Sequence, residues 1–144
     1  GLAQPKDRTL AYADVKSAKA EENVLRLLFT DQKLIHSVEE QLPAAWFSAP
    51  VLRKIYERVL ELDRSGSLVD ALAFEGQLET SEMSLLAGIL EQGVPPGDHR
   101  AELREYINTI RLQRVKDGTL TQAGEDPLLT FGRMKNQNAG GQTI

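Results

Sequence analysis

Histidine, the side chain most often used for acid–base and metal chemistry, is nearly absent from this sequence. The chain has two histidines, His36 and His99, and no cysteine. His36 falls in the middle of a predicted helix among charged neighbours, which is typical of an ordinary surface histidine. His99 follows Asp98 at a predicted helix start, which favours a capping turn over a pair of metal ligands. Because a His-Glu-x-x-His motif and a cysteine cluster are both absent, we expect no metal site.

The remaining polar groups do not form a recognisable catalytic pattern either. The serines fit helix caps, turns or helix surfaces, and none lies in a nucleophile elbow: Ser48, Ser65, Ser67, Ser81 and Ser84. Gly140-Gly141 lacks the preceding strand and the following lysine of a phosphate loop. We interpret the carboxylate pairs Glu21-Glu22 and Glu39-Glu40 as solvated helix faces, because paired acid–base catalysis needs a cleft. The prediction is a chain without catalytic residues or a cofactor of its own.

Composition narrows the classes of partner. With 144 residues the chain fits one domain, or one domain with a small appendage, and its 41% hydrophobic residues are enough for a core. A net charge of −4 gives no overall attraction to a phosphate backbone, so direct nucleic-acid binding is not expected, although a local basic patch stays open. No apolar run approaches the roughly 18 residues that span a bilayer, so we expect a soluble protein without a membrane partner.

The elements that must position these side chains are all predicted to be helical, because no segment alternates apolar and polar residues for long enough to form a strand. The predicted helices cover residues 17–29, 31–42, 50–65, 70–79, 81–92 and 98–124, with a short amphipathic helix after Asp126-Pro127. Six starts or stops support these bounds: caps at Asp31, Ser48, Asp70, Ser81 and Asp98, and a left-handed stop at Gly66. Trp46 and Phe47 are predicted to fill the core from a short connector.

These elements suggest an all-α domain in three parts. Residues 1–15 are predicted to be a linker remnant of an excised domain, residues 16–110 a compact helical bundle, and residues 111–144 a C-terminal helical hairpin that turns near Gly124.

The predicted hairpin carries apolar residues on short elements: Leu120, Leu128, Leu129, Phe131, Met134 and Ile144. Isolated helices shorter than roughly 12–15 residues are marginal in water, so these side chains must pack on something. They either fold back on the bundle or form an amphipathic surface that binds a groove on another protein. Spacing alone leaves both alternatives open.

Two stretches resemble a known family pair. They read Asn-Val-Leu-Arg-Leu-Leu-Phe-Thr-Asp-Gln-Lys-Leu-Ile (23–35) and Leu-Pro-Ala-Ala-Trp-Phe-Ser-Ala-Pro-Val-Leu-Arg-Lys-Ile-Tyr-Glu (42–57), followed by Gly66 before the cap Asp70. This pattern is similar to two related domains: the C-terminal domain of bacterial DnaG-type primase and the N-terminal domain of DnaB-type replicative helicase. The resemblance covers about half of the chain, and it implies a bacterial, cytoplasmic protein.

Two details resemble the primase sibling more closely. Residues 78–83 pass directly between two predicted helices, where the helicase domain usually has a Gly-rich insertion. Residues 103–115 also resemble the primase helix that leads to a C-terminal hairpin. The resemblance therefore implies a non-catalytic domain that docks primase onto the hexameric helicase. The zinc module and metal-dependent polymerase core of primase would lie in absent upstream domains.

The resemblance to primases also implies which residues bind partner proteins. The expected helicase-binding residues on the hairpin are Leu120, Leu128, Leu129, Phe131, Met134, Lys135 and Ile144. Some relatives bind the acidic tail of single-stranded-DNA-binding protein, and the basic residues available here are Lys16, Lys19 and Arg26. The alternatives are the helicase's own ring-forming N-terminal domain, which receives primase, and a small helical enzyme or ligand carrier, which would need a closed apolar cavity.

Overall fold

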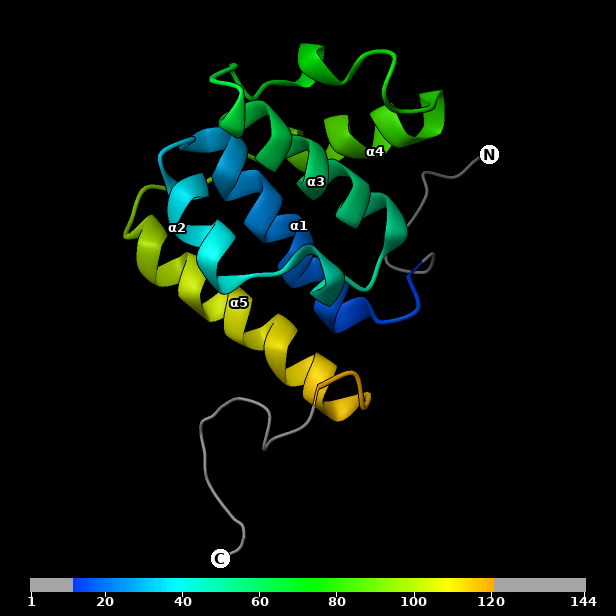
Figure 1. Ribbon diagram of the computed structural model, residues 1–144, viewed down its shortest axis with the longest axis vertical. Coiled ribbons are helices and arrows are strands. Elements are labelled where there is room, and N and C mark those ends of the chain that lie inside the picture. The colour runs from blue at the N-terminus through cyan, green and yellow to red at the C-terminus, as the bar shows by residue number, and fades with distance from the viewer. Residues whose placement is uncertain (1–11, 121–144) are drawn as a thin grey trace, which may run out of the picture. The chain divides into compact units, whose positions relative to one another are not determined.

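The structure is a computed structural model that describes residues 12–120. Within that range the fold is all-α, as predicted, with five α-helices, two short 3₁₀ turns and no strand (Figure 1). The α-helices are α1 (Val15–Thr30), α2 (Leu34–Gln41), α3 (Pro50–Arg64), α4 (Thr80–Glu91) and α5 (His99–Lys116). The turns are η2 (Ala44–Trp46) and η3 (Ala71–Phe74). Of the described residues, 12–110 belong to one compact unit and 111–120 to a second. No helix in the described range is long and apolar enough to cross a membrane.

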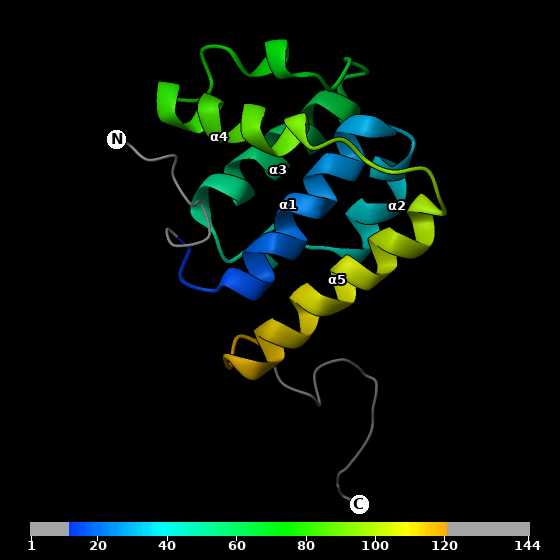
Figure 2. The same cartoon turned by 180° about the vertical axis from the view of Figure 1, so that it is seen from behind.

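Helix α1 is the element around which the first unit packs. The Asp14 carboxylate accepts a hydrogen bond from the Ser17 backbone N–H at 3.1 Å and so caps the helix. Helix α1 contacts α2, α3 and α4. It crosses the middle of the bundle, as the opposite views in Figures 1 and 2 show. Val24, Leu25 and Leu28 are fully buried, as expected for a helix covered on more than one side.

The start and stop of α3 follow local backbone chemistry. Pro50 is its first residue, where a missing N–H costs no hydrogen bond, and Gly66 ends the turn after it with a left-handed φ of 77°. Both features were predicted. The predicted cap at Ser48 was wrong, because the N-cap position is Ala49 and the Ser48 hydroxyl instead donates to Glu21.

The predicted fourth helix was also wrong. The Asp70 carboxylate does cap this segment by accepting from the Ala73 N–H at 3.2 Å, but only η3 forms. Glu75 takes an extended conformation, and Gly76 follows with φ of 82°, so the helical hydrogen bonds cannot continue. The N-cap of α4 is then Glu79 rather than the predicted Ser81, and the helix begins at Thr80.

Helix α5 begins where the sequence indicated. The Asp98 carboxylate accepts from the Ala101 N–H at 3.1 Å. The helix ends at Lys116 rather than near Gly124, because Gly118 adopts a left-handed φ of 87° and the Leu120 N–H closes onto the Arg114 carbonyl at 3.0 Å.

Aromatic side chains consolidate the core between distant segments. Phe47 is 1% exposed and stacks on Tyr56 with ring centroids 4.5 Å apart. The Tyr56 hydroxyl donates to the Leu42 carbonyl at 2.7 Å, which satisfies the buried polar end of the ring. Phe29 packs against Phe74 with centroids 5.6 Å apart. Phe47 fills the core as predicted, whereas Trp46 packs against the core and is only partly buried.

Candidate interaction surfaces

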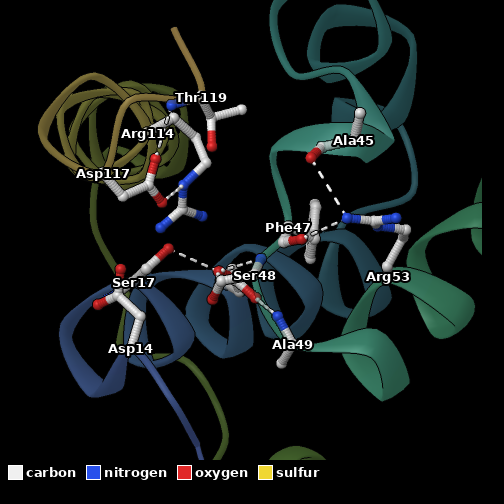
Figure 3. Close-up of polar contacts among 11 residues, drawn as sticks. Asp14, Ser17, Ala45, Phe47, Ser48, Ala49, Arg53, Arg114, Asp117 and Thr119 are labelled. Atoms are coloured by element: carbon white, nitrogen blue, oxygen red, sulfur yellow. Dashed lines mark hydrogen bonds and ion pairs between the residues drawn. The ribbon is translucent and has the colours of Figure 1, made fainter.

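The Glu21 carboxylate, on α1, lies inside the bundle and accepts hydrogen bonds from the residues that lead into α3. Its side chain is 0% exposed. One carboxylate oxygen accepts from the hydroxyls of Ser17 at 2.6 Å and Ser48 at 2.7 Å, and from the Ser48 N–H at 2.9 Å. The other accepts from the Ala49 N–H at 3.2 Å. Figure 3 shows Ser17, Ser48 and Ala49 turned toward this point. The carboxylate therefore satisfies N–H groups just before α3 that have no partner within that helix.

Glu22 is likewise buried, at 7% exposed, and accepts from the Tyr12 hydroxyl at 2.6 Å. The interpretation of Glu21-Glu22 as a solvated face was therefore wrong. A sequence signal was available, because Glu21 stands in register with Val24, Leu25 and Leu28 on the apolar stripe. A carboxylate in that stripe indicates an internal structural role.

Arg26 is also an internal residue and is 7% exposed. Its Nε donates to the Ile89 carbonyl near the end of α4 at 2.7 Å, and its Nη1 donates to the Asn23 side chain. The guanidinium thus joins α1 to the carbonyl end of α4, where the helix dipole favours a positive charge. Lys16 and Lys19 are exposed on α1. Arg26 is therefore not at the surface beside these two lysines, and a contact of Lys16 and Lys19 with an acidic tail stays a prediction.

The predicted hairpin surface lies almost wholly outside the described residues. Leu120 is described and is partly buried. Leu128, Leu129, Phe131, Met134, Lys135 and Ile144 fall outside the described range, so their role in binding stays a prediction.

The two histidines occupy different settings. His36 is exposed on α2, as predicted for a surface histidine. His99 is the first residue of α5, and its Nε2 lies 3.3 Å from the Pro95 carbonyl. Within residues 12–120, no group of histidines and carboxylates is arranged to hold a metal ion.

A shallow hollow of 470 Å³ lies along the outer face of α3 and is lined mainly by charged side chains: Lys54, Glu57, Arg58, Glu61, Arg64, Gln77 and Leu78. The cations around it form ion pairs, between Lys54 and Glu82 at 2.9 Å and between Arg64 and Glu39 at 2.6 Å. The Glu79 backbone N–H and then Lys54 lower the pKa of Glu82. An open, charged hollow lacks the apolar lining of a ligand carrier's cavity.

A comparison with known protein families identifies one match. A model of the DnaB-like helicase N-terminal domain matches residues 13–111. The chain belongs to this family. No curated protein and no solved structure matches the chain.

The matched range covers α1 to α4 and most of α5, so it includes Glu21 and Arg26. The resemblance to this family is therefore confirmed, whereas the more specific assignment to a primase stays a prediction. Within the matched range, Glu21 and Arg26 both form hydrogen bonds that join segments far apart in the sequence.

Proposed function

We propose that this chain is a non-catalytic protein-interaction domain of the replicative helicase–primase machinery. The family match over residues 13–111 carries this proposal. The structure supports it, because two buried ionic groups, Glu21 and Arg26, form hydrogen bonds that join helices. A domain of this kind acts by holding other proteins close, which raises their effective concentration without requiring tight binding.

Within this machinery, the N-terminal domain of the helicase itself has the more direct support. The matched family is named for that domain. In this role the domain would be a structural part of the helicase ring, would associate with further copies of itself and would receive primase.

The second candidate is the helicase-binding domain of a primase, and the connection between η3 and α4 favours it. η3 ends at Phe74, α4 begins at Thr80, and only residues 75–79 lie between them. This direct passage is one of the two details that resemble primases, and the helix over residues 103–115 is the other. In this role the chain would be monomeric alone and would bind a hexameric helicase through the C-terminal segment.

Sedimentation velocity separates the two roles. The chain would be run alone over a range of micromolar concentrations and then with a hexameric replicative helicase from the same source. Self-association supports the helicase role. A monomer that binds the hexamer, and loses binding when residues 126–144 are deleted, supports the primase role. A chain that neither self-associates nor binds a helicase or a primase would show that the proposal is wrong.

A further inference from the structure

The cations of this chain are unevenly distributed. Between residues 65 and 98 there is no lysine or arginine, but there are six carboxylates: Asp70, Glu75, Glu79, Glu82, Glu91 and Asp98. This stretch therefore carries a formal charge of −6. Because the whole chain carries −4, the remaining residues sum to +2. Figures 1 and 2 show the stretch, drawn in green, running from the end of α3 through α4 along one side of the bundle.

Two of the most exposed large apolar side chains lie within this acidic stretch. Leu68 is 69% exposed and Leu72 is 73% exposed, one in the loop after α3 and the other in η3. Their neighbours Val69 and Phe74 are 4% and 0% exposed. The chain thus points one set of apolar side chains into the core and leaves Leu68 and Leu72, the leucine pair, in water.

The loop that carries Leu68 is held in place by Gln32, which lies between α1 and α2. The Gln32 amide nitrogen donates to the Ser67 carbonyl at 2.9 Å, and its oxygen accepts from the Val69 N–H at 3.0 Å. Gln32 therefore fixes the backbone on both sides of Leu68. η3 is tied down in turn by the Asp70 cap. A fixed backbone lowers the entropy cost of binding, which is expected of a preorganised contact.

The surrounding charge determines what can cover the leucine pair. The cations of α3 lie beside this stretch and are engaged. Arg58 donates to the Ala73 carbonyl of η3 at 3.4 Å and pairs with Glu61 at 2.7 Å. Lys54 pairs with Glu82, and Arg64 pairs with Glu39. The side chains of Glu75 and Glu91, by contrast, are exposed. This field repels phosphates and anionic lipid, and it attracts a polypeptide that places lysines or arginines beside apolar side chains.

We infer that the leucine pair, together with the exposed carboxylates of the same stretch, forms a docking site for a short cationic, amphipathic segment of another protein. The apolar area of two leucines, on the order of a few hundred Å², is far below the roughly 1,200 Å² of a stable interface. The contact is therefore small and transient, and too small to hold two copies of this chain together. This inference holds for either position of the domain in the helicase–primase machinery.

The test uses the full chain and a fluorescent amphipathic peptide of leucine and lysine, with a second peptide in which glutamate replaces every lysine. Binding is measured by fluorescence anisotropy, and the site is mapped by backbone amide shifts in NMR spectra. The lysine peptide is expected to bind and to shift residues 67–75. The variant Leu68→Ser/Leu72→Ser should weaken binding about tenfold, the loss expected when the apolar centre of a contact is removed. Glu75→Lys/Glu91→Lys should weaken binding and its dependence on salt.

Matched controls lie elsewhere on the surface. Leu112→Ser removes a leucine that is 46% exposed, and Glu40→Lys reverses an exposed carboxylate on α2; neither should change binding. Gln32→Ala should weaken binding without touching the peptide, because it frees the loop around Leu68.

Three results would overturn the inference. One is equal affinity for the lysine and glutamate peptides, and another is binding that the Leu68→Ser/Leu72→Ser variant leaves unchanged. The third is concentration-dependent dimerisation that this variant abolishes, which would assign the leucine pair to a second copy of the chain. All substituted positions are exposed except partly buried Gln32, whose variant is checked by circular dichroism.

Discussion

Replacing Glu21 with alanine should strongly destabilise the bundle, because the carboxylate is fully buried and accepts four hydrogen bonds. The substitution leaves the backbone N–H groups of Ser48 and Ala49 without their acceptor in a shielded position. An unsatisfied buried donor costs about 1–3 kcal/mol, and the lost side-chain volume adds to this cost. Because two backbone donors lose their acceptor and a cavity is left, we expect the free energy of unfolding to fall by about 3–5 kcal/mol.

Urea unfolding followed by far-ultraviolet circular dichroism measures this loss. Glu40→Ala is the matched control, because Glu40 is an exposed glutamate on α2, and it should change the free energy of unfolding by less than about 0.5 kcal/mol. Ser17→Ala and Ser48→Ala each remove one hydroxyl donor and should cost about 0.5–1.5 kcal/mol.

The location of the damage is as informative as its size. Hydrogen exchange should accelerate first at the Ser48 and Ala49 amides and through the first turn of α3, since these groups lose their acceptor. The reasoning would be refuted if Glu21→Ala lowered stability by less than about 1 kcal/mol, or if those two amides kept their protection.

Three further changes test other parts of the bundle. Arg26→Ala should cost about 2–4 kcal/mol in urea unfolding, because the Ile89 carbonyl loses a charged donor in a buried setting. Gly66→Ala should cost about 1–2 kcal/mol through backbone strain alone, since its φ is 77° and no atom lies within 4 Å of the added methyl group; a loss below about 0.3 kcal/mol would contradict this. Burial, and then the charge of Glu39, raise the pKa of Tyr56 above its ordinary value of 10.0. The buried phenol therefore stabilises the fold fully below pH 10, and this contribution is lost as the pH rises further. Tyr56→Phe should flatten the alkaline loss of stability and, by removing the hydrogen bond to Leu42, cost about 1 kcal/mol at neutral pH.

The parts of the fold that follow from the sequence are those decided within one turn of chain. Pro50, Gly66 and Asp98 act through their own backbone geometry or on an N–H three residues away, so these bounds could be predicted. The predicted helix over 70–79 failed because two effects competed. Its apolar spacing fits a helix, but Gly76 adopts a left-handed conformation directly after an extended Glu75.

The buried ions could not be placed from local pattern alone. Arg26 and the Ile89 carbonyl are 63 residues apart, and Glu21 meets Ala49 across 28 residues. Nothing near Arg26 in the sequence distinguishes it from a surface arginine, whereas Glu21 lies on the apolar stripe and carried a readable signal. The exposure of Leu68 could not be predicted either, because Gln32 holds the backbone around it from 35 residues earlier in the chain.

A carboxylate at the start of α3 also limits how α1 can lie against it. Apolar side chains tolerate sliding, since one leucine can replace another when two helices shift by a turn of about 5.4 Å. Glu21 does not, because any such shift would carry its charge away from the Ser48 and Ala49 amides while keeping it shielded from water. One acidic residue thus fixes the alignment of two amphipathic helices. A redesign that made the interior wholly apolar would no longer favour that alignment over shifted ones.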